Sequence, residues 1–293
     1  GGDISEDGKR KPEKDIYPYS KMKDILGWCN KYNSYFWEYV AQHEEPDIWD
    51  YLYDRWVVMK KAIENGLDHE GVLPGGLNVR RKAYSYYQHA MSYQNTMQRR
   101  GLLFAYALAV SEENAAGGTI VTAPTCGSCG VLPAVLYLIH TQYKVTEKKI
   151  VNAMATAGIF GAVIKANASI SGAEVGCQGE VGSACAMTCA AATRLFGGTP
   201  PQIECAASMG MEHFLGLTCD PVCGLVQIPC IERNAFAAAR VMDCTQYSLM
   251  SDGSHIVPFD TVIEAMKRTG HDLPSLYKET AKGGLAYLVK KNG

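Results

Sequence analysis

Seven of the eleven cysteines lie in one stretch of the chain, between Ser169 and Asn234. Three of them occur where a backbone turns or a helix begins. Cys177 follows a glycine in GAEVGCQGE, Cys219 lies two residues before a proline in GLTCDP, and Cys230 follows a proline in IPCIERN. Thiols at such positions can point inward from separate segments, which is what a soft metal ion or a metal cluster needs.

A second interpretation is that these cysteines are small buried hydrophobic residues, a common use of the free thiol. We favour it for Cys185, Cys189 and Cys205, which lie in alanine-rich helical runs. For the three turn cysteines, separations of 42 and 11 positions match no short metal-binding motif. Spacing alone leaves both interpretations open.

Composition excludes several classes of protein. Lys+Arg 28 against Asp+Glu 30 gives a net charge of −2, which argues against nucleic acid or an anionic membrane as the main partner. The longest apolar run, residues 153–164, is shorter than the roughly 20 residues that span a bilayer. The N-terminus has no apolar core of a secretory signal. An odd number of clustered cysteines favours a reducing cytoplasm.

Hydrophobic periodicity predicts an all-α fold, and no sustained alternation of period 2 is present. We expect a single compact multi-helix domain over residues 19–293, with a Gly-rich loop and short irregular segments around the cysteine site. Residues 1–18 are predicted to be a flexible linker or the remnant of a cloning sequence. The expected helices cover residues 20–42, 46–66, 80–100, 101–114, 147–167, 173–196, 200–214, 229–249 and 258–270, with one more from about 132.

The segment 118–130 (GTIVTAPTCGSCG) is predicted to be a short β-like run that enters a Gly-rich loop before a helix. Small residues at a helix N-terminus can offer backbone N–H groups to a carboxylate. The pair Cys126 and Cys129 lacks the second ligand pair of a zinc ribbon and the βαβ pattern of a thioredoxin-like redox site. We therefore favour a substrate loop.

Taken together, these segments resemble the α chain of the iron–sulfur-dependent L-serine dehydratases (L-serine ammonia-lyases). The similarity runs from about Tyr19 to Ala286. It includes NASISGAEVGCQGEVGSAC, MEHFLGLTCDPVCGLVQIPCIERNA, DGSHIVPFDTVIEAM and APTCGSCGVLPAVL, where the family commonly has APTNGAAG. In that family three cysteines hold a [4Fe–4S] cluster, and the corresponding positions here are Cys177, Cys219 and Cys230.

The resemblance implies a reaction. Three thiolates on a four-iron cluster leave one iron without a cysteine ligand. This iron can act as a Lewis acid on the substrate hydroxyl. The implied reaction is α,β-elimination of water from L-serine, which gives pyruvate and ammonia. Pyridoxal phosphate on Lys165 would be another route, but no open α/β pattern surrounds that lysine. Two alternatives stay open: a cluster-dependent lyase acting on cysteine or threonine, and a non-catalytic metal- or cluster-binding structural or sensor protein.

Polar residues near the three cysteines are candidates for the chemistry. Glu174, His213 and Lys165 are the candidate acid, base or carboxylate clamp; Glu174 could instead cap a helix and His213 could be a core histidine. Glu180 and Asp220 also lie in these motifs. The candidate substrate-binding residues are Thr125, Cys126, Gly127, Ser128, Asn167 and Ser169.

The resemblance also implies a partner. Family members carry a β domain or a β subunit whose Ser-rich segment ending in His-Thr contributes to the active site, and this chain has no such motif. We expect the chain to be incomplete without that β portion and to form a homo- or hetero-oligomer. Some single-chain members end in a cysteine that binds the open iron. No cysteine follows Cys244 here, so this mode of ligation is not expected.

Overall fold

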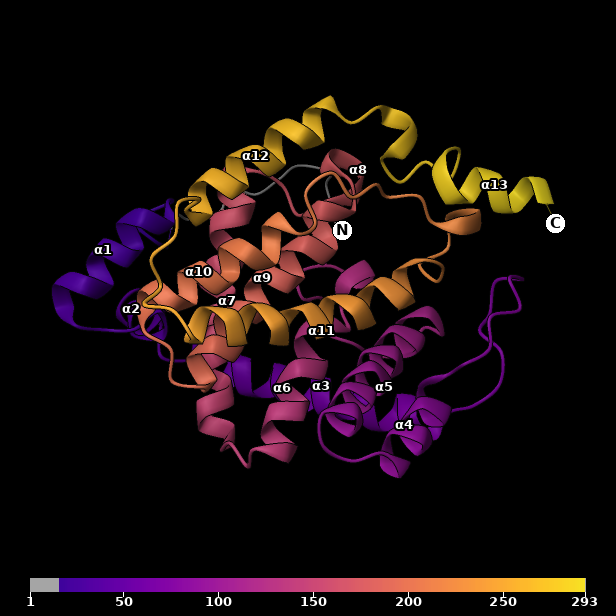
Figure 1. The fold of residues 1–293 in the computed structure, drawn as a ribbon, viewed down its shortest axis with the longest axis horizontal. Coiled ribbons are helices and arrows are strands. Elements are labelled where there is room, and N and C mark those ends of the chain that lie inside the picture. The colour runs from indigo at the N-terminus through magenta and orange to yellow at the C-terminus, as the bar shows by residue number, and fades with distance from the viewer. Residues whose placement is uncertain (1–15, 293) are drawn as a thin grey trace.

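The computed structural model describes residues 16–292 and the side chains of residues 16–289. This part of the chain folds into thirteen α-helices, without a strand, in one body (Figure 1). The expected all-α, single-domain fold is therefore confirmed. Residues 1–15 of the predicted linker lie outside the described part, and the boundary at residue 18 stays a prediction.

Helix α9 (Ser183–Leu195) is the centre of the fold. It packs against α7 (Glu147–Asn167), α10 (Pro200–Glu212), α11 (Cys230–Leu249) and α6 (Val131–Gln142). Its first eleven residues are all buried, and they are mainly Ala, Cys, Thr and Ser. Small side chains let neighbouring helices approach α9 from several sides, so its hydrophobic character is spread around the axis rather than confined to one stripe.

The N-terminal part surrounds this centre with α1 (Met22–Tyr32), α2 (Phe36–His43), α3 (Ile48–Asp68), α4 (Ala83–Ser92) and α5 (Asn95–Ala115). The single helix expected over 20–42 is wrong, because Asn33 adopts a left-handed conformation, φ 50°, and ends α1. Glu38 then accepts the Tyr35 N–H at 2.7 Å and helps to start α2. Two helices are expected over residues 80–100 and 101–114. The break between the observed helices lies earlier, at Tyr93 and Gln94, so α5 begins within the range expected for the first helix.

Helix α7 matches its predicted bounds, 147–167. By length and composition alone this helix could cross a membrane, although the apolar run had been expected to be too short. However, 67% of its most apolar window is buried inside the protein. We interpret α7 as a core helix that packs against α9 and α2.

Three further expectations need correction. The segment 118–130 forms no strand; it ends in a 3₁₀ turn, η1 (Cys126–Ser128). The region expected to be helical over 173–196, after a turn at Cys177, is divided into α8 (Gly172–Val175), the π-turn η2 (Gln178–Gly182) and α9; the break lies at Gly176, φ 76°, next to the expected turn. After α12 (Phe259–Asp272), a helix that was not predicted, α13 (Gly284–Asn292), follows the 3₁₀ turn η4 (Ser275–Tyr277).

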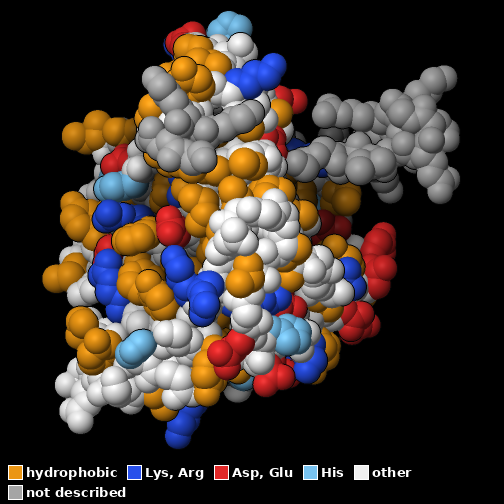
Figure 2. Space-filling view, turned by 90° about the vertical axis from the view of Figure 1, so that its right-hand side faces the viewer, with side chains coloured by type: hydrophobic (Ala, Val, Ile, Leu, Met, Phe, Trp, Pro, Cys, Tyr) orange, Lys and Arg blue, Asp and Glu red, His pale blue; other side chains and the backbone are white. Residues whose placement is uncertain are grey.

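The molecular surface in Figure 2 carries hydrophobic side chains distributed among Lys and Arg rather than separated from them.

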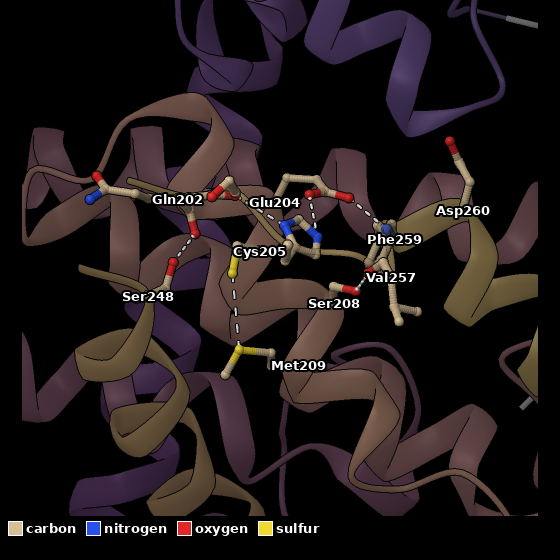
Figure 3. Close-up of polar contacts among 12 residues, drawn as sticks. Gln202, Glu204, Cys205, Ser208, Met209, Ser248, Val257, Phe259 and Asp260 are labelled. Atoms are coloured by element: carbon tan, nitrogen blue, oxygen red, sulfur yellow. Dashed lines mark hydrogen bonds and ion pairs between the residues drawn. The ribbon is translucent and has the colours of Figure 1, made fainter. Parts of the chain in front are cut away.

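Figure 3 shows how the connector before α12 is attached to α10. His255 Nε2 lies 2.9 Å from Glu204 Oε2, and the other carboxylate oxygen accepts the Phe259 N–H at 2.5 Å. Ser208 Oγ donates to the Val257 carbonyl at 2.7 Å. Because Glu204 is only 4% exposed, these partners offset the cost of burying its carboxylate and fix where α12 begins.

Candidate functional site

The three turn cysteines come from three different segments. Cys177 lies between α8 and η2, Cys219 lies in the extended chain after α10, and Cys230 is the first residue of α11. All three are buried, with exposed fractions of 2%, 4% and 9%. Each of the three segments therefore places its thiol in the interior of the protein.

Burial dominates the acid–base properties of these three thiols. Burial raises the pKa of Cys177 to about 11, and the nearby Arg233 guanidinium limits that rise. Burial, followed by the neighbouring Cys177 and Glu180, raises the pKa of Cys230 to about 12. Burial, followed by Cys177 and Glu180, also raises the pKa of Cys219. All three are neutral thiols near pH 7 unless a metal charge favours the thiolate.

A buried carboxyl, Glu180, stands beside the cysteines and is only 8% exposed. Thr125 Oγ1 donates a hydrogen bond to Glu180 Oε1 at 2.9 Å, and the Cys219 thiol donates to Oε2 at 3.8 Å. Burial raises the pKa of Glu180. A Cβ atom at Gly172 would lie 2.6 Å from Glu180 Oε2 and 3.1 Å from Cys219 Sγ. Glycine at 172 therefore leaves the space in which the carboxyl and the thiol meet.

The predicted substrate loop is fixed against the start of α11 by Asn234. This side chain, 1% exposed, accepts the Gly130 N–H at 2.9 Å and donates to the carbonyls of Gly127 and Cys230, both at 2.8 Å. Thr125 and Ser128 are both buried, and their hydroxyl oxygens lie 3.1 Å apart. The loop and the Cys230 segment thus form one unit, and Thr125 connects it to Glu180.

A second contact joins the cysteine site to the C-terminal helix. Arg233 donates to the Thr218 carbonyl at 2.7 Å and to Asp220 Oδ1 at 3.2 Å. The other oxygen of Asp220 accepts the Leu285 N–H at 2.8 Å, near the N-terminus of α13. Next to it, Cys219 N–H donates to Tyr277 O at 2.9 Å. The segment that carries Cys219 is therefore held on one side by α11 and on the other by the C-terminal region.

The other predicted residues lie elsewhere. Glu174 is exposed and, with Ser169, lines a surface groove beside α12. His213 is exposed, and its Nδ1 lies 2.7 Å from the Met209 carbonyl. Lys165 is exposed on α7, and Asn167 donates to the carbonyls of Ser20 and Val163 at 2.6 and 2.8 Å. Catalytic or substrate-binding roles for these residues stay predictions.

The remaining cysteines are buried except Cys126 and Cys223. Cys126 is exposed and Cys129 is buried, and all eleven cysteines, which lie within the described residues, are free thiols. Cys185, Cys189 and Cys205 are buried in the helices, as predicted.

Arg233 and Asn234 were not selected from the sequence, and Glu180 was named without a role. A local pattern could have found the first two, because positions three and four after Cys230 lie on the same face of a helix. Glu180 follows Cys177 by three residues, but its contact with Thr125, 55 positions away, depends on the fold.

The chain matches the family described as "Serine dehydratase alpha chain" over residues 14–286. It is 50% identical over 252 residues to the L-serine dehydratase of Streptomyces coelicolor, an alignment that covers 85% of this chain and 55% of that protein. It is 44% identical over 285 residues to L-serine dehydratase 1 of Escherichia coli, which covers 94% of this chain and 63% of that protein. A relative from Haemophilus influenzae, also called L-serine dehydratase, is 43% identical over 286 residues. This alignment covers 94% of this chain and 63% of that protein.

The chain thus spans between about half and two thirds of the length of these curated relatives. The family match, in contrast, covers nearly the whole chain, including the three turn cysteines, Glu180 and the Asn234 contact. The chain belongs to the serine dehydratase alpha chain family.

Proposed function

We propose that this chain is the cluster-binding α portion of an iron–sulfur L-serine dehydratase, a lyase that converts L-serine into pyruvate and ammonia. The observation that supports the proposal is the burial of three thiols from three separate segments, together with the contact between the Cys219 thiol and the buried carboxyl of Glu180. The names of the relatives supply the substrate and favour serine over cysteine or threonine.

Within the described residues, no group of three or more His, Cys, Asp or Glu is placed so that it could hold a metal ion. The proposal of a cluster therefore rests on the family resemblance and on the chemistry of the donors, because iron–sulfur clusters are held by cysteine thiolates. Cys177, Cys219 and Cys230 would hold the cluster, and the bound cluster would supply a Lewis-acidic iron at its open corner.

The protein residues around this position suit an amino acid. The Glu180 carboxyl, oriented by Thr125, can face the ammonium group of serine or accept a proton at its oxygen. The loop that contains Thr125, Cys126, Gly127 and Ser128 lies where backbone N–H groups can hold the substrate carboxylate. Asn234 keeps that loop in place. Burial of the site excludes water from the reacting groups.

Full activity, in this proposal, requires a β domain or subunit, and the enzyme works in the cytoplasm. The relatives extend well beyond the region that this chain matches, and the family is described as an alpha chain. Both findings support a companion portion. A reducing cytoplasm would keep the cysteines available to a cluster.

The test is anaerobic reconstitution with iron and sulfide, followed by a pyruvate assay with L-serine. The portion of the Escherichia coli relative that this chain does not match is added as a separate chain in a parallel sample. We expect turnover to rise at least about tenfold with that portion, because it completes the site. An equal rate in both samples would contradict the need for a partner, and sulfide release from L-cysteine at a higher rate would favour the alternative lyase.

A further inference from the structure

The substrate loop carries two thiols that the proposed cluster site does not use. Cys126 begins the 3₁₀ turn η1, Cys129 follows its last residue, and the Cys129 N–H donates to the Cys126 carbonyl at 3.4 Å. Cys126 is exposed, whereas Cys129 is 0% exposed and belongs to the hydrophobic core. A thiol that is open to solution therefore stands one turn away from a thiol that is not.

The turn brings these two thiols within reach of a disulfide bond. In a 3₁₀ turn, side chains three positions apart eclipse one another, and a rise of about 2 Å per residue places their α-carbons roughly 6 Å apart. A disulfide spans α-carbon separations of about 4.4–6.8 Å. Cys129 keeps helical dihedral angles, φ −63° and ψ −17°. The bond can therefore close by rotation of the two side chains.

Hydrogen bonds from two other elements hold the turn in place. Asn114 of α5 donates to the Cys126 carbonyl at 3.2 Å. Asn234 of α11 donates to the Gly127 carbonyl at 2.8 Å and accepts the Gly130 N–H at 2.9 Å. The backbone thus presents Cys129 to Cys126 at a fixed short range, and a thiol held in this way competes well with thiols in solution.

We propose that Cys126 and Cys129 form a modification site, at which a small disulfide of the glutathione type oxidises the pair to an internal disulfide. Cys126 gives its proton to water and attacks one sulfur of the small disulfide, so that a mixed disulfide forms and one small thiolate leaves. Cys129 then gives its proton to water and attacks Cys126 Sγ, which releases the second small thiolate. Both leaving thiolates take up protons. The chain loses two electrons and two protons, and the small disulfide becomes two thiols.

Burial sets the order of these two steps. Only Cys126 is open to a molecule in solution, and burial raises the pKa of the Cys129 thiol, so Cys129 is not the first nucleophile. In the second step Cys129 needs no contact with solvent, because its target is the Cys126 sulfur. An adduct on the substrate loop is thereby replaced by a compact bond, which a dithiol can reduce again.

The test treats the full chain, first reduced and then freed of reductant, with oxidised glutathione and analyses its peptides by mass spectrometry. In the native chain, the peptide with both cysteines should lose two hydrogens and carry no glutathione, and dithiothreitol should reverse the change. Cys129→Ala and Cys129→Ser each remove the second thiol, so glutathione on Cys126 should rise at least about tenfold above its native level. Equal far-ultraviolet circular dichroism shows that the variants are folded.

Other cysteines of the same chain are matched controls. Cys223 is also exposed and also lies in a 3₁₀ turn, η3 (Val222–Gly224), but no cysteine stands three positions from it. It should therefore keep its glutathione. The sulfurs of Cys185 and Cys189 lie 4.0 Å apart, but both side chains are 0% exposed. This pair should stay reduced, because no small disulfide can reach it.

Three results would each overturn the proposal: a native Cys126 that keeps glutathione as Cys223 does, a native Cys126 that stays a free thiol, or a bond from Cys126 to a cysteine other than Cys129. The proposal does not rest on the proposed function. Neither iron nor serine takes part in the test, so its failure would leave the cluster and the lyase activity to be judged by their own experiments.

Discussion

At the scale of single residues, the fold separates two carboxyls that the sequence places six positions apart. Glu180 is buried against Cys219 and Thr125, whereas Glu174 is exposed beside α12. Sequence reasoning favoured Glu174 because it precedes Cys177 by three residues. The geometry favours Glu180, because this carboxyl accepts hydrogen bonds from the Cys219 thiol and from Thr125 of the substrate loop.

Replacing these two carboxyls distinguishes the hypotheses. Glu180→Gln keeps the shape of the side chain and removes its charge, so we expect serine turnover to fall at least about 100-fold while the iron content stays the same. Glu174→Gln should change turnover less than about twofold, within the range of surface substitutions. Pyruvate formation and iron analysis on the same samples measure both. A larger loss in the Glu174 variant would return the catalytic role to that residue.

At the scale of elements, Asn234 joins the substrate loop to α11. Asn234→Ala removes three buried hydrogen bonds and leaves the Gly130 N–H without its acceptor. We expect the free energy of unfolding to fall by about 2–3 kcal/mol. Hydrogen exchange at the Gly130 amide should become faster, because local opening of the loop becomes easier.

Asn114→Ala is the matched control for the loop. Asn114 also donates its side-chain amide to the loop, to the Cys126 carbonyl at 3.2 Å, but at an exposed position. Water can replace this bond, so the expected loss is below about 0.5 kcal/mol. Equal losses for the two variants in urea denaturation would contradict the role given to Asn234.

The start of α4 depends on another buried carboxyl. Glu112, 1% exposed, accepts the N–H groups of Lys82 at 2.7 Å and Ala83 at 3.3 Å. Burial raises the pKa of Glu112 more than these hydrogen bonds, Arg81 and Lys82 lower it. The folded carboxyl therefore holds its proton more tightly than the unfolded chain does, where the pKa is about 4.3.

The sign of the resulting pH dependence follows by linkage. The stability gained from the protonated Glu112 is complete below the unfolded pKa and is lost as the pH rises through the folded value. Glu112→Gln stays neutral at every pH. The free energy of unfolding of the native chain, minus that of the variant, should therefore fall as the pH rises above the unfolded pKa of about 4.3, by about 1.4 kcal/mol for each unit by which folding raises the pKa. A difference that rises with pH in urea denaturation would contradict this.

At the scale of the whole molecule, the sequence predicts the helical architecture well where local chemistry sets the ends. Helix α7 has its predicted bounds, and α10 begins at Pro200 after a Thr199–Gln202 capping box. Prediction was wrong where backbone geometry overrides periodicity. Asn33 adopts a positive φ and ends α1 inside a continuous apolar pattern. Helix α13 was missed; Asp220, 65 positions away, accepts a hydrogen bond at its first turn.

The site was predictable only where local sequence sets the position of a residue. Turn positions identified Cys177, Cys219 and Cys230 as able to converge, and family resemblance supplied the cluster. The groups that surround them come from long-range contacts. Arg233 reaches Asp220 across 13 positions, and Thr125 reaches Glu180 across 55. Such pairs follow from how α9, α11 and the loop pack, which periodicity does not describe.

The most direct measurement of the central claim is the metal content of the anaerobically reconstituted protein and of its Cys→Ser variants. We predict about four iron and four sulfide per native chain, with a broad visible absorbance. Cys177→Ser, Cys219→Ser and Cys230→Ser should each lose this iron, whereas Cys185→Ser, at a buried thiol of α9, should keep it. Stoichiometric zinc without iron, or full iron retention in the variants at positions 177, 219 and 230, would contradict the account.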